Sequence, residues 1–352
     1  MKSKLKMAIG FGMAVPIVSL VTLLGLEFNP GSVEKVSVQN MRPNEPVPVG
    51  KTLKLLCWNL QFAGSRKHHF FYDGGQAVQV PVSDVETTLK QITTLLKSRN
   101  PDFALLQEID RHSDRTGNID QLELLKSYAQ GVSWVSTPYH KVPYVPHPSH
   151  EPMGRVNLNL GTLSKYEITS ARRHQLALLN EPRWRQFFNL RRAILETIIP
   201  VGVGANRPNL ILGNTHLSAF SGGDGTLNKQ ISQIEAWIEA IPKGQAWILA
   251  GDFNLLPPED TPSRLGDDAA LYADSKNPIE RLTRKYKHAF PDRLSNDART
   301  YLPFGAGEPD RKIDYIFYGG SIELESAMVL REASAISDHL PLEISFRLTT
   351  SR

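Results

Sequence analysis

The sequence lacks several features that would narrow its class at once. It contains a single cysteine, Cys57, so no disulfide can form within the chain. It also carries little net charge, because the formal value is only +4 and residues 1–6 supply three of these charges. The rest of the chain has 37 basic against 36 acidic side chains, which is a weak electrostatic basis for tight nucleic-acid binding.

What the chain does contain is enough apolar sequence to build a full core. Its 352 residues are 41% hydrophobic and 22% charged, as in an ordinary globular protein. This length suits one large domain or two small ones, and no internal repeat or low-complexity tract divides it. We expect one globular catalytic domain over residues 52–350.

The longest uncharged run lies near the N-terminus. Residues 7–26 follow a basic start and are long enough to span a bilayer. We expect residues 1–28 to be an uncleaved membrane anchor that leaves the remainder outside the cytoplasm, at a bacterial-type inner membrane. A cleaved signal segment, which would make the protein secreted, and a buried core helix are the alternatives. Residues 29–51 hold four prolines and are expected to form a linker.

Within the domain, buried strands alternate with amphipathic helices. Apolar runs predict strands at 53–58, 102–107, 157–163, 192–199, 210–215, 246–250, 312–318 and 340–348. Apolar residues at helical spacing predict helices at 85–99, 119–129 and 227–241. Residues 137–155, which are rich in proline, are expected to be irregular.

Residues 246–258 show the feature around which the domain is organised. The apolar run stops at Gly251, and Asp252 and Asn254 follow in a turn. A carboxylate and an amide at the mouth of a buried strand suit a hydrated hard cation or a phosphate. A single Asp-x-Asn is more often an ordinary turn that ends a strand.

The same few residue types recur at or near the ends of the other predicted strands. Two packed sheets would bring such strand ends together at one rim. Taken one at a time, each residue has an ordinary structural explanation, but their repetition along the domain favours a common site. The set comprises Asn59, Glu108, His216, Asp252, Asn254, Asp314, Asp338 and His339.

Six short motifs at these positions resemble the endonuclease/exonuclease/phosphatase superfamily, which has the deoxyribonuclease I-like fold. They are Cys57-Trp58-Asn59, Leu106-Gln107-Glu108, Asn214-Thr215-His216-Leu217, Gly251-Asp252-Phe253-Asn254, Lys312-Ile313-Asp314-Tyr315 and Ser337-Asp338-His339. Each motif is weak alone, but the set occurs in the family's order over residues 52–348. The resemblance implies an α/β fold, a four-layered sandwich of two packed mixed β-sheets flanked by helices. It also implies a divalent-metal-dependent phosphodiester hydrolase.

The resemblance further implies which residues hold the metal. Glu108 looks like the main ligand of Mg²⁺, supported by Asn59 and Asp338, with Mn²⁺ as an alternative ion. A hard cation with few protein ligands and several waters suits such a set. Water would attack the phosphorus in line, without a covalent enzyme intermediate.

The remaining roles also follow from the resemblance. His339 looks like the general base, and Asp314 would hold it and make it more basic. His216 and Asn254 would bind the substrate by donating hydrogen bonds to its phosphate oxygens. Asp252 would orient the attacking water or hold a second metal.

The motifs say less about the substrate than about the fold and the reaction. Abasic-site endonucleases of this superfamily follow their first asparagine with an acidic or small residue and glycine. Here Asn59 is followed by Leu60-Gln61-Phe62-Ala63, which counts against that branch. His216 in its Thr-His-Leu context looks like the branch with deoxyribonucleases, sphingomyelinases and inositol-phosphate phosphatases. The aromatic loop at 68–72 and the arginines within 172–192 could contact either a lipid headgroup or nucleic acid.

An anchored domain of near-neutral charge fits a lipid headgroup or another membrane-surface phosphodiester better than long DNA. We therefore predict a membrane-bound phosphodiesterase that faces out of the cytoplasm, with no protein partner implied. One alternative is an anchored or secreted nuclease that cleaves DNA or RNA. An alternative of another class is a membrane-tethered binding protein without turnover.

Overall fold

The computed structural model describes residues 27–43, 45–204, 207–219, 223–272, 277–290 and 295–349. The anchor or signal helix expected at residues 7–26 lies outside this part of the chain. None of the helices in the described ranges combines the length and the apolar character that crossing a membrane requires.

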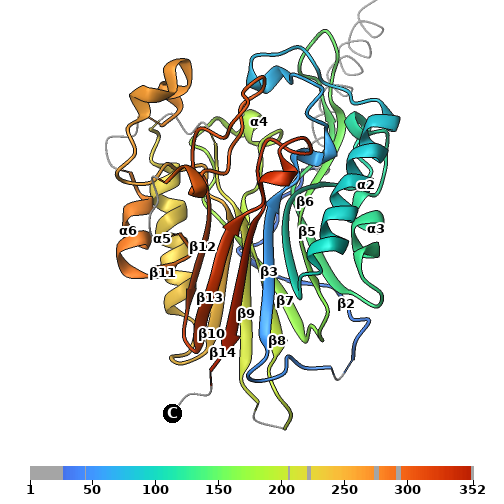
Figure 1. Ribbon diagram of the computed structural model, residues 1–352. Helices are drawn as coiled ribbons and strands as arrows, with labels where there is room; N and C mark the ends of the chain where they lie inside the picture. The colour runs from blue at the N-terminus through green and yellow to red at the C-terminus, as the bar shows by residue number, and fades with distance from the viewer. Residues whose placement is uncertain are drawn as a thin grey trace, which may run out of the picture.

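Two mixed sheets pack face to face in the described part of the chain (Figure 1). The first has the strand order β1-β7-β8-β9-β10-β12-β11, with bounds Val33–Val36, Ser170–Gln175, Ala193–Pro200, Asn209–His216, Ala246–Asp252, Asp314–Gly319 and Lys287–His288. The second has the order β13-β14-β3-β4-β6-β5-β2, with bounds Ile322–Val329, Leu342–Leu348, Thr52–Asn59, Phe103–Asp110, Gly154–Ser164, Ser133–Val145 and Val38–Gln39. Each sheet has one parallel pair at its centre, β9–β10 and β3–β4.

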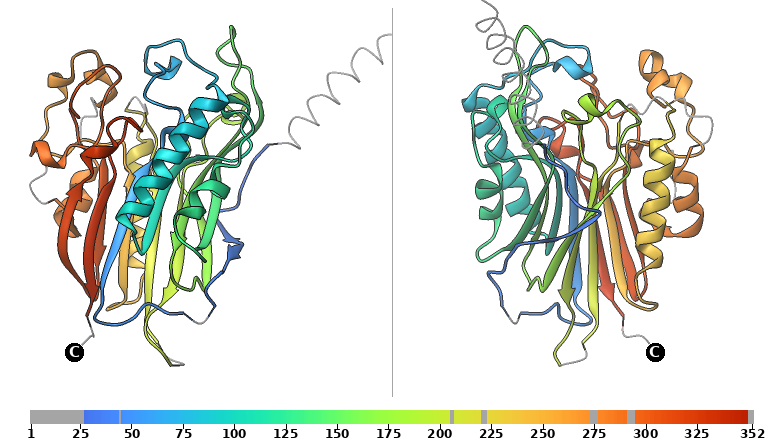
Figure 2. Two further views of the ribbon diagram at one scale, coloured as in Figure 1. Left: turned by 45° about the vertical axis from the view of Figure 1, so that its right-hand side comes forward. Right: turned by 180° about the vertical axis from the view of Figure 1, so that it is seen from behind.

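Helices cover the outer face of each sheet. Helices α2 (Val82–Arg99) and α3 (Gln121–Leu125) lie against the second sheet, and α5 (Thr226–Glu239) and α6 (Ile279–Lys285) against the first (Figures 1 and 2). A short helix, α4 (Arg183–Gln186), lies in the connection from β7 to β8. The predicted four-layered α/β sandwich is confirmed.

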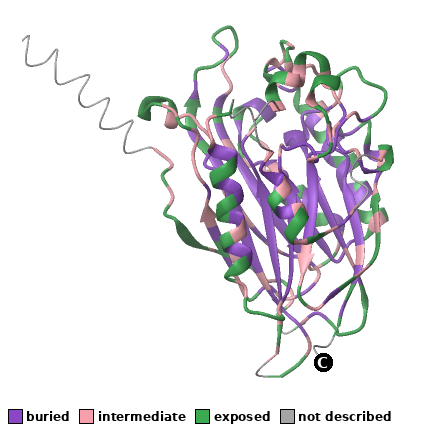
Figure 3. Cartoon of the chain, turned by 90° about the vertical axis from the view of Figure 1, so that its left-hand side faces the viewer, coloured by how far each residue is buried: buried purple, intermediate pink, exposed green. Residues whose placement is uncertain are grey.

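The apolar runs that predicted the central strands are explained by burial on both faces (Figure 3). Along β10, Ile248 and Ala250 join the core between the sheets. Trp247 and Leu249 alternate with them and pack in the cluster beneath α5. A strand that is buried on both sides has no polar face, so its sequence is a continuous apolar run.

One polar bridge crosses the core between the two sheets. The amide of Asn214 on β9 donates to the carbonyl oxygens of Leu106 (3.0 Å) and Gly161 (2.8 Å), which belong to β4 and β6. Its oxygen accepts a hydrogen bond of 2.7 Å from Nε2 of Gln107. This bridge fixes the relative position of the sheets next to Glu108 and His216.

The expected linker at residues 29–51 instead adds a strand to each sheet. Strand β1 pairs with β7 at the edge of the first sheet, and β2 pairs with β5 at the edge of the second. The amide of Val47 then donates to the carbonyl of Pro200, and the Val47 side chain is buried. These strands are only four and two residues long, so they carry too little alternation to be recognised from sequence.

The expectation of irregular structure at 137–155 was wrong. The long hairpin of β5 and β6 occupies most of this segment. Its pairing register shifts beside Pro138 and again beside Pro143. Proline is tolerated in a strand at such bulges, where no ladder hydrogen bond is needed from its nitrogen.

Candidate active site

Strand ends from both sheets meet at one rim of the sandwich. In the parallel pair of the first sheet, His216 and Asp252 are register partners at the ends of β9 and β10. Strand β12 runs antiparallel to β10, so its first residue, Asp314, pairs with Asp252. In the second sheet, Asn59 ends β3 beside Gln107 of β4.

A cleft of about 630 Å³ opens at this rim. Six of the predicted site residues line it, namely Glu108, His216, Asp252, Asn254, Asp338 and His339. The other two lie directly behind these residues. Asn59 donates a hydrogen bond of 3.0 Å to Asp252, and Asp314 lies 2.9 Å from the ring of His339. The structure therefore brings all eight predicted residues together.

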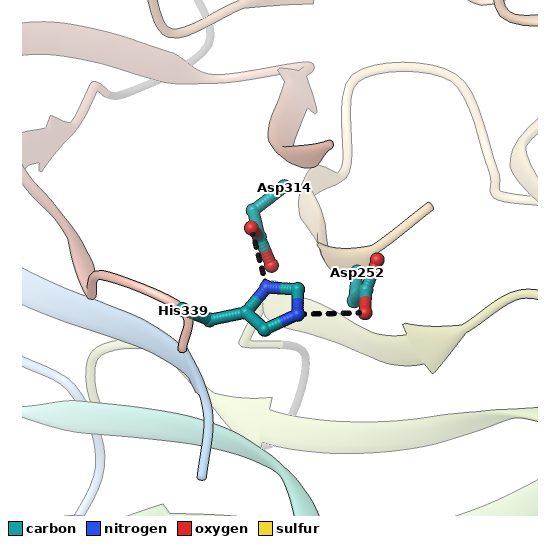
Figure 4. A group of neighbouring side chains, drawn as sticks. All are labelled: Asp252, Asp314 and His339. Carbon is teal, nitrogen blue, oxygen red and sulfur yellow. Dashed lines mark hydrogen bonds and ion pairs between the residues drawn. The ribbon is translucent and has the colours of Figure 1, made fainter. Parts of the chain in front are cut away.

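The imidazole of His339 lies between two carboxylates (Figure 4). Its Nδ1 is 2.9 Å from Oδ2 of Asp314, and its Nε2 is 3.6 Å from Oδ2 of Asp252. Burial alone would lower the pKa of His339, but the charges of Asp314 and Asp252 outweigh it and raise this pKa well above its usual value. Backbone contacts hold the residue, because its carbonyl accepts from Nε1 of Trp58 at 2.8 Å.

The local backbone directs Glu108 into the cleft. Strand β4 bulges between Leu106 and Ile109, and Glu108 adopts the left-handed conformation with φ of 57°. Such a conformation in a non-glycine residue costs on the order of 1 kcal/mol and persists where the surrounding structure requires it. The Glu108 side chain is 19% exposed, into the cleft.

Glu108 and Asp338, the two carboxylates expected to hold a metal ion, both line the cleft. Burial raises the pKa of both carboxyl groups, and that of Asp338 rises to about 6, with the Glu108 charge contributing. A bound cation would offset this unfavourable accumulation of negative charge. Two carboxylates at the wall of an open cleft fit a hard divalent ion that keeps several waters.

Asn59 contacts the carboxylates of Glu108 and Asp252, and it does so in a way that differs from the expected role of a metal ligand. Its Nδ2 faces Glu108 (3.3 Å) and Asp252 (3.0 Å), while its oxygen accepts from the backbone amide of Gln61. In this orientation Asn59 donates to the acids and offers no oxygen to a cation. Rotating the amide by half a turn would present the oxygen instead.

A different trio, Asp252, Asp314 and His339, also has potential ligand atoms within 4.8 Å of one another. The two carboxylates contact different nitrogens of the ring, so one ion could not replace both contacts. This arrangement orients the imidazole, with Asp314 at Nδ1 and Asp252 near Nε2. Burial is the main cause that raises the pKa of Asp252 to about 6, and Asp314 adds to it.

His216 is a neutral hydrogen-bond donor at the cleft. Burial, followed by the charges of Arg192 and His339, lowers its pKa well below the usual value. The hydroxyl of Tyr139 lies 3.2 Å from Nδ1 of His216, and burial keeps that phenol protonated by raising its pKa well above 10. Nε2 of His216 lies 3.3 Å from Oδ2 of Asp252, and this carboxylate favours the tautomer that donates from Nε2 and accepts from Tyr139 at Nδ1.

Asn254 lies on the same wall as His216. It has φ of 51°, and its backbone amide donates to Oδ1 of Asp252 at 2.9 Å. Its Nδ2 donates one proton to the carbonyl of Leu217 at 3.2 Å. The second amide proton of Asn254 remains for a ligand in the cleft, as the predicted role requires.

Arg192 also belongs to the site, although the sequence placed it only within a basic loop. The residue is 8% exposed, lines the cleft, and its guanidinium stacks 5.3 Å from the ring centre of Tyr139. Its Nη1 is buried and makes no hydrogen bond among the described residues. Because Nη1 is shut off from solvent, an anion in the cleft would meet the guanidinium at its other nitrogens.

Tyr301 and Arg311 complete the wall behind the general base. The ring of Tyr301 packs edge-on against His339 with 5.2 Å between centroids. Arg311 stacks over Tyr301 and Tyr272 and pairs with Asp268 at 2.7 Å. No sequence signal identified these residues, because they lie in irregular segments that only the fold brings to the cleft.

These motifs and this fold define a family. The model of the Endonuclease/Exonuclease/phosphatase family matches residues 56–339, so the chain belongs to that family. Its members are typically hydrolases of phosphoester bonds and generally use divalent metals. No curated protein is similar enough in sequence to match the chain.

Solved structures support the fold. An endonuclease/exonuclease/phosphatase from Beutenbergia cavernae DSM 12333 matches with a TM-score of 0.59 and 20% identity, over 85% of this chain and 72% of that one. The human Nocturnin catalytic domain with a bound sulfate anion matches with a TM-score of 0.52 and 16% identity, over 89% and 97%. A humanized D. rerio TDP2 matches at 0.52 and 14%, over 84% and 99%. At these identities the likeness concerns the fold alone.

Proposed function

We propose that this protein is a divalent-metal-dependent phosphodiesterase that uses a water molecule activated by His339. The observation that carries the proposal is the position of His339 between Asp314 and Asp252, at a cleft that is also lined by further carboxylates and by neutral or cationic donors. A divalent cation held by Glu108 and Asp338 would neutralise the phosphate and stabilise the leaving oxygen.

The attacking water would lie to one side of the pair formed by His339 and Asp252. Their facing atoms, Nε2 and Oδ2, are 3.6 Å apart, so a water within hydrogen-bond distance of both sits off the line that joins them. As the water oxygen bonds to phosphorus and the ester oxygen departs, the water proton passes to Nε2 of His339. Asp314 stabilises the resulting imidazolium through the contact at Nδ1.

The opposite wall stabilises the charge that develops on the phosphate. The free amide proton of Asn254 and the guanidinium of Arg192 are the donors there. His216 would donate through Nε2–H, which it shares with Oδ2 of Asp252 3.3 Å away. They are held by the fold before the substrate binds, so little reorganisation is needed at the transition state.

We further propose that the substrate is a lipid headgroup or another membrane-surface phosphodiester. The outer wall of the cleft carries Asp73, Asp267 and Asp268. These acids would repel the neighbouring phosphates of a long polyanion, but they leave room for one phosphodiester with a neutral or cationic leaving group. The low net charge of the domain supports the same choice.

Hydrolysis by the full-length protein in detergent micelles tests this function. The substrates are sphingomyelin, phosphatidylcholine, phosphoinositides, bis(p-nitrophenyl) phosphate and single- and double-stranded DNA, each with Mg²⁺ or with a chelator. We expect lipid cleavage that requires both Mg²⁺ and His339, and that survives in the control His112→Ala, an exposed histidine away from the cleft. DNA cleavage with the same requirements would show that the substrate is nucleic acid and not a lipid. No turnover of any substrate would favour the binding protein.

A further inference from the structure

Every exposed aromatic side chain in the described part of the chain lies at the cleft end. Tyr72, Tyr144, Trp184 and Phe304 are exposed by 41%, 55%, 66% and 39%. We call these four residues the aromatic rim. Aromatic side chains of this kind are enriched where proteins meet the headgroup region of a membrane.

Strand topology places the rim residues at this end. Tyr72 follows β3, which ends at Asn59 in the site. Trp184 precedes β8, whose first residues pair with the end of β9. Phe304 precedes β12, and Tyr144 lies near the tip of the β5–β6 hairpin, on the side where β4 ends.

Contacts between the loops join much of the rim into one surface. Phe71, next to Tyr72, packs edge-on against His147 of the hairpin at 5.5 Å. On the other side, His69 stacks on Phe304 at 4.3 Å. The segment after Trp184 is tied to the hairpin as well, because Nε2 of His140 contacts the carbonyl of Phe188 at 2.9 Å.

Basic side chains flank the most exposed member of the rim. Arg183 and Arg185 are exposed on both sides of Trp184. Arg185 makes a weak ion pair of 3.7 Å with Glu181, and no pair is seen for Arg183 within the described residues. An exposed tryptophan between two arginines suits a surface with an apolar interior and phosphate headgroups.

The chain enters the domain at the same end. Glu27, the first described residue, pairs with Arg191 at 2.5 Å, in the connection that carries Trp184. The uncharged residues 7–26 directly precede it in the sequence. A membrane segment there would attach beside the cleft and not at the opposite end of the sandwich.

We propose that the aromatic rim docks on the surface of a phospholipid bilayer, with Trp184 in the interfacial region and the cleft facing the headgroups. This inference rests on the proposed function, because it explains how a lipid phosphodiester reaches the site without leaving the membrane. The bilayer is the occupant that the aromatic character, the arginines and the entry point of the chain favour together.

Fluorescence quenching in vesicles tests the docking. The full-length protein is reconstituted into phosphatidylcholine–phosphatidylglycerol vesicles that contain a bromine-labelled phosphatidylcholine, which quenches nearby tryptophan at short range. Trp184 is the one tryptophan that is exposed, since Trp58, Trp237 and Trp247 are buried and Trp134 is partly buried. We expect quenching in the wild type and its loss in Trp184→Phe.

A matched control places a tryptophan at the other end of the domain. Val203 is 90% exposed and lies in the connection from β8 to β9, far from the strand ends that form the site. The double variant Trp184→Phe/Val203→Trp should remain unquenched. Quenching of this variant, equal quenching with and without Trp184, or no quenching of the wild type would each overturn the docking.

Hydrolysis of bis(p-nitrophenyl) phosphate by the wild type in the same vesicles separates the two proposals. Turnover of this soluble diester without quenching at Trp184 would overturn the docking and leave the phosphodiesterase in place. Quenching at Trp184 without turnover of soluble or lipid diesters would keep the docking and remove the proposed function.

Discussion

Asp252 and His216 are register partners in the parallel pair of β10 and β9, and Oδ2 of Asp252 lies 3.3 Å from Nε2 of His216. The same oxygen is 3.0 Å from Nδ2 of Asn59 and 3.6 Å from Nε2 of His339. One carboxylate oxygen therefore joins the three sequence motifs that contain His216, Asn59 and His339.

The first prediction concerns Asp314. Its charge raises the pKa of His339, so replacing it with asparagine lowers that pKa. The base must be unprotonated, and the rate rises as pH passes through this pKa. Asp314→Asn should therefore move the acid limb of the pH–rate profile to lower pH, while kcat falls about 10²–10⁴-fold because the imidazolium loses its partner.

The profile is measured as kcat/KM for bis(p-nitrophenyl) phosphate. Asp267→Asn, which removes an exposed carboxylate on the cleft wall, is the matched control and should leave the acid limb in place. An acid limb that does not move in Asp314→Asn would show that His339 is not the titrating base.

A second prediction concerns stability in the absence of metal. The pKa of Asp338 rises from 3.8 to about 6 in the fold, chiefly through burial. The folded state therefore disfavours the charged form, and stability falls as pH rises from about 4 to 6 and stays lower above it. Asp338→Asn should remove this cost, up to about 3 kcal/mol, and raise Tm in chelator at pH 8.

Adding Mg²⁺ tests whether the charge of Asp338 causes this loss of stability. The ion should raise Tm of the wild type more than that of Asp338→Asn, because it compensates a charge that the variant lacks. At pH 4 and below, the difference in Tm between the two proteins in chelator should nearly vanish. A variant that is less stable than the wild type at pH 8 would contradict the argument.

Arg192 gives the third prediction. Its guanidinium lines the cleft, so a substrate oxygen is expected to meet it there. Arg192→Gln should lower kcat/KM for a soluble diester by about 10²-fold, in line with the loss of one preorganised donor. Arg192→Lys should recover only part of this, because a lysine lacks the fixed fork of donors and the stacking on Tyr139.

The control for Arg192 is an arginine on the same sandwich but away from the cleft. Arg347 is exposed near the end of β14, and His339 lies just before the start of that strand. Arg347→Gln should leave kcat/KM unchanged. Equal losses in both variants would indicate a general electrostatic effect of net charge and not a contact with the substrate.

A structural feature could be predicted from the sequence when neighbouring residues alone determine it. Strand β10 was predicted because burial on both faces makes its sequence continuously apolar. Strands β1 and β2 were missed because each pairs over only a few residues at a sheet edge. Most of β6 was predicted at 157–163, but β5 was missed because its prolines indicate irregular structure unless the bulges that accommodate them are known.

The same distinction applies to the site. The eight predicted residues lie in short motifs at or beside strand ends, so their identity was readable once the motifs were taken as an ordered set. Arg192 and Tyr301 have no such motif. The role of Arg192 depends on Tyr139 of the other sheet, and that of Tyr301 on its contact with His339, so only the assembled fold shows them.

The last prediction tests whether the bridge across the core positions the site. Asn214→Leu keeps the size of the side chain but removes one hydrogen bond each from the carbonyls of Leu106 and Gly161 and from the amide of Gln107, which keeps its bond to the carbonyl of Leu105. Buried polar groups that lose a partner cost about 1–3 kcal/mol each, so the free energy of unfolding should fall by at least about 3 kcal/mol in a urea titration. Asn209→Leu, at the far end of the same strand and half-buried, should cost less than about 1 kcal/mol. Because the bridge lies next to both Glu108 and His216, kcat should fall in Asn214→Leu even under conditions where the variant remains folded. Loss of stability with unchanged kcat would mean that the two sheets keep their relative position without this contact.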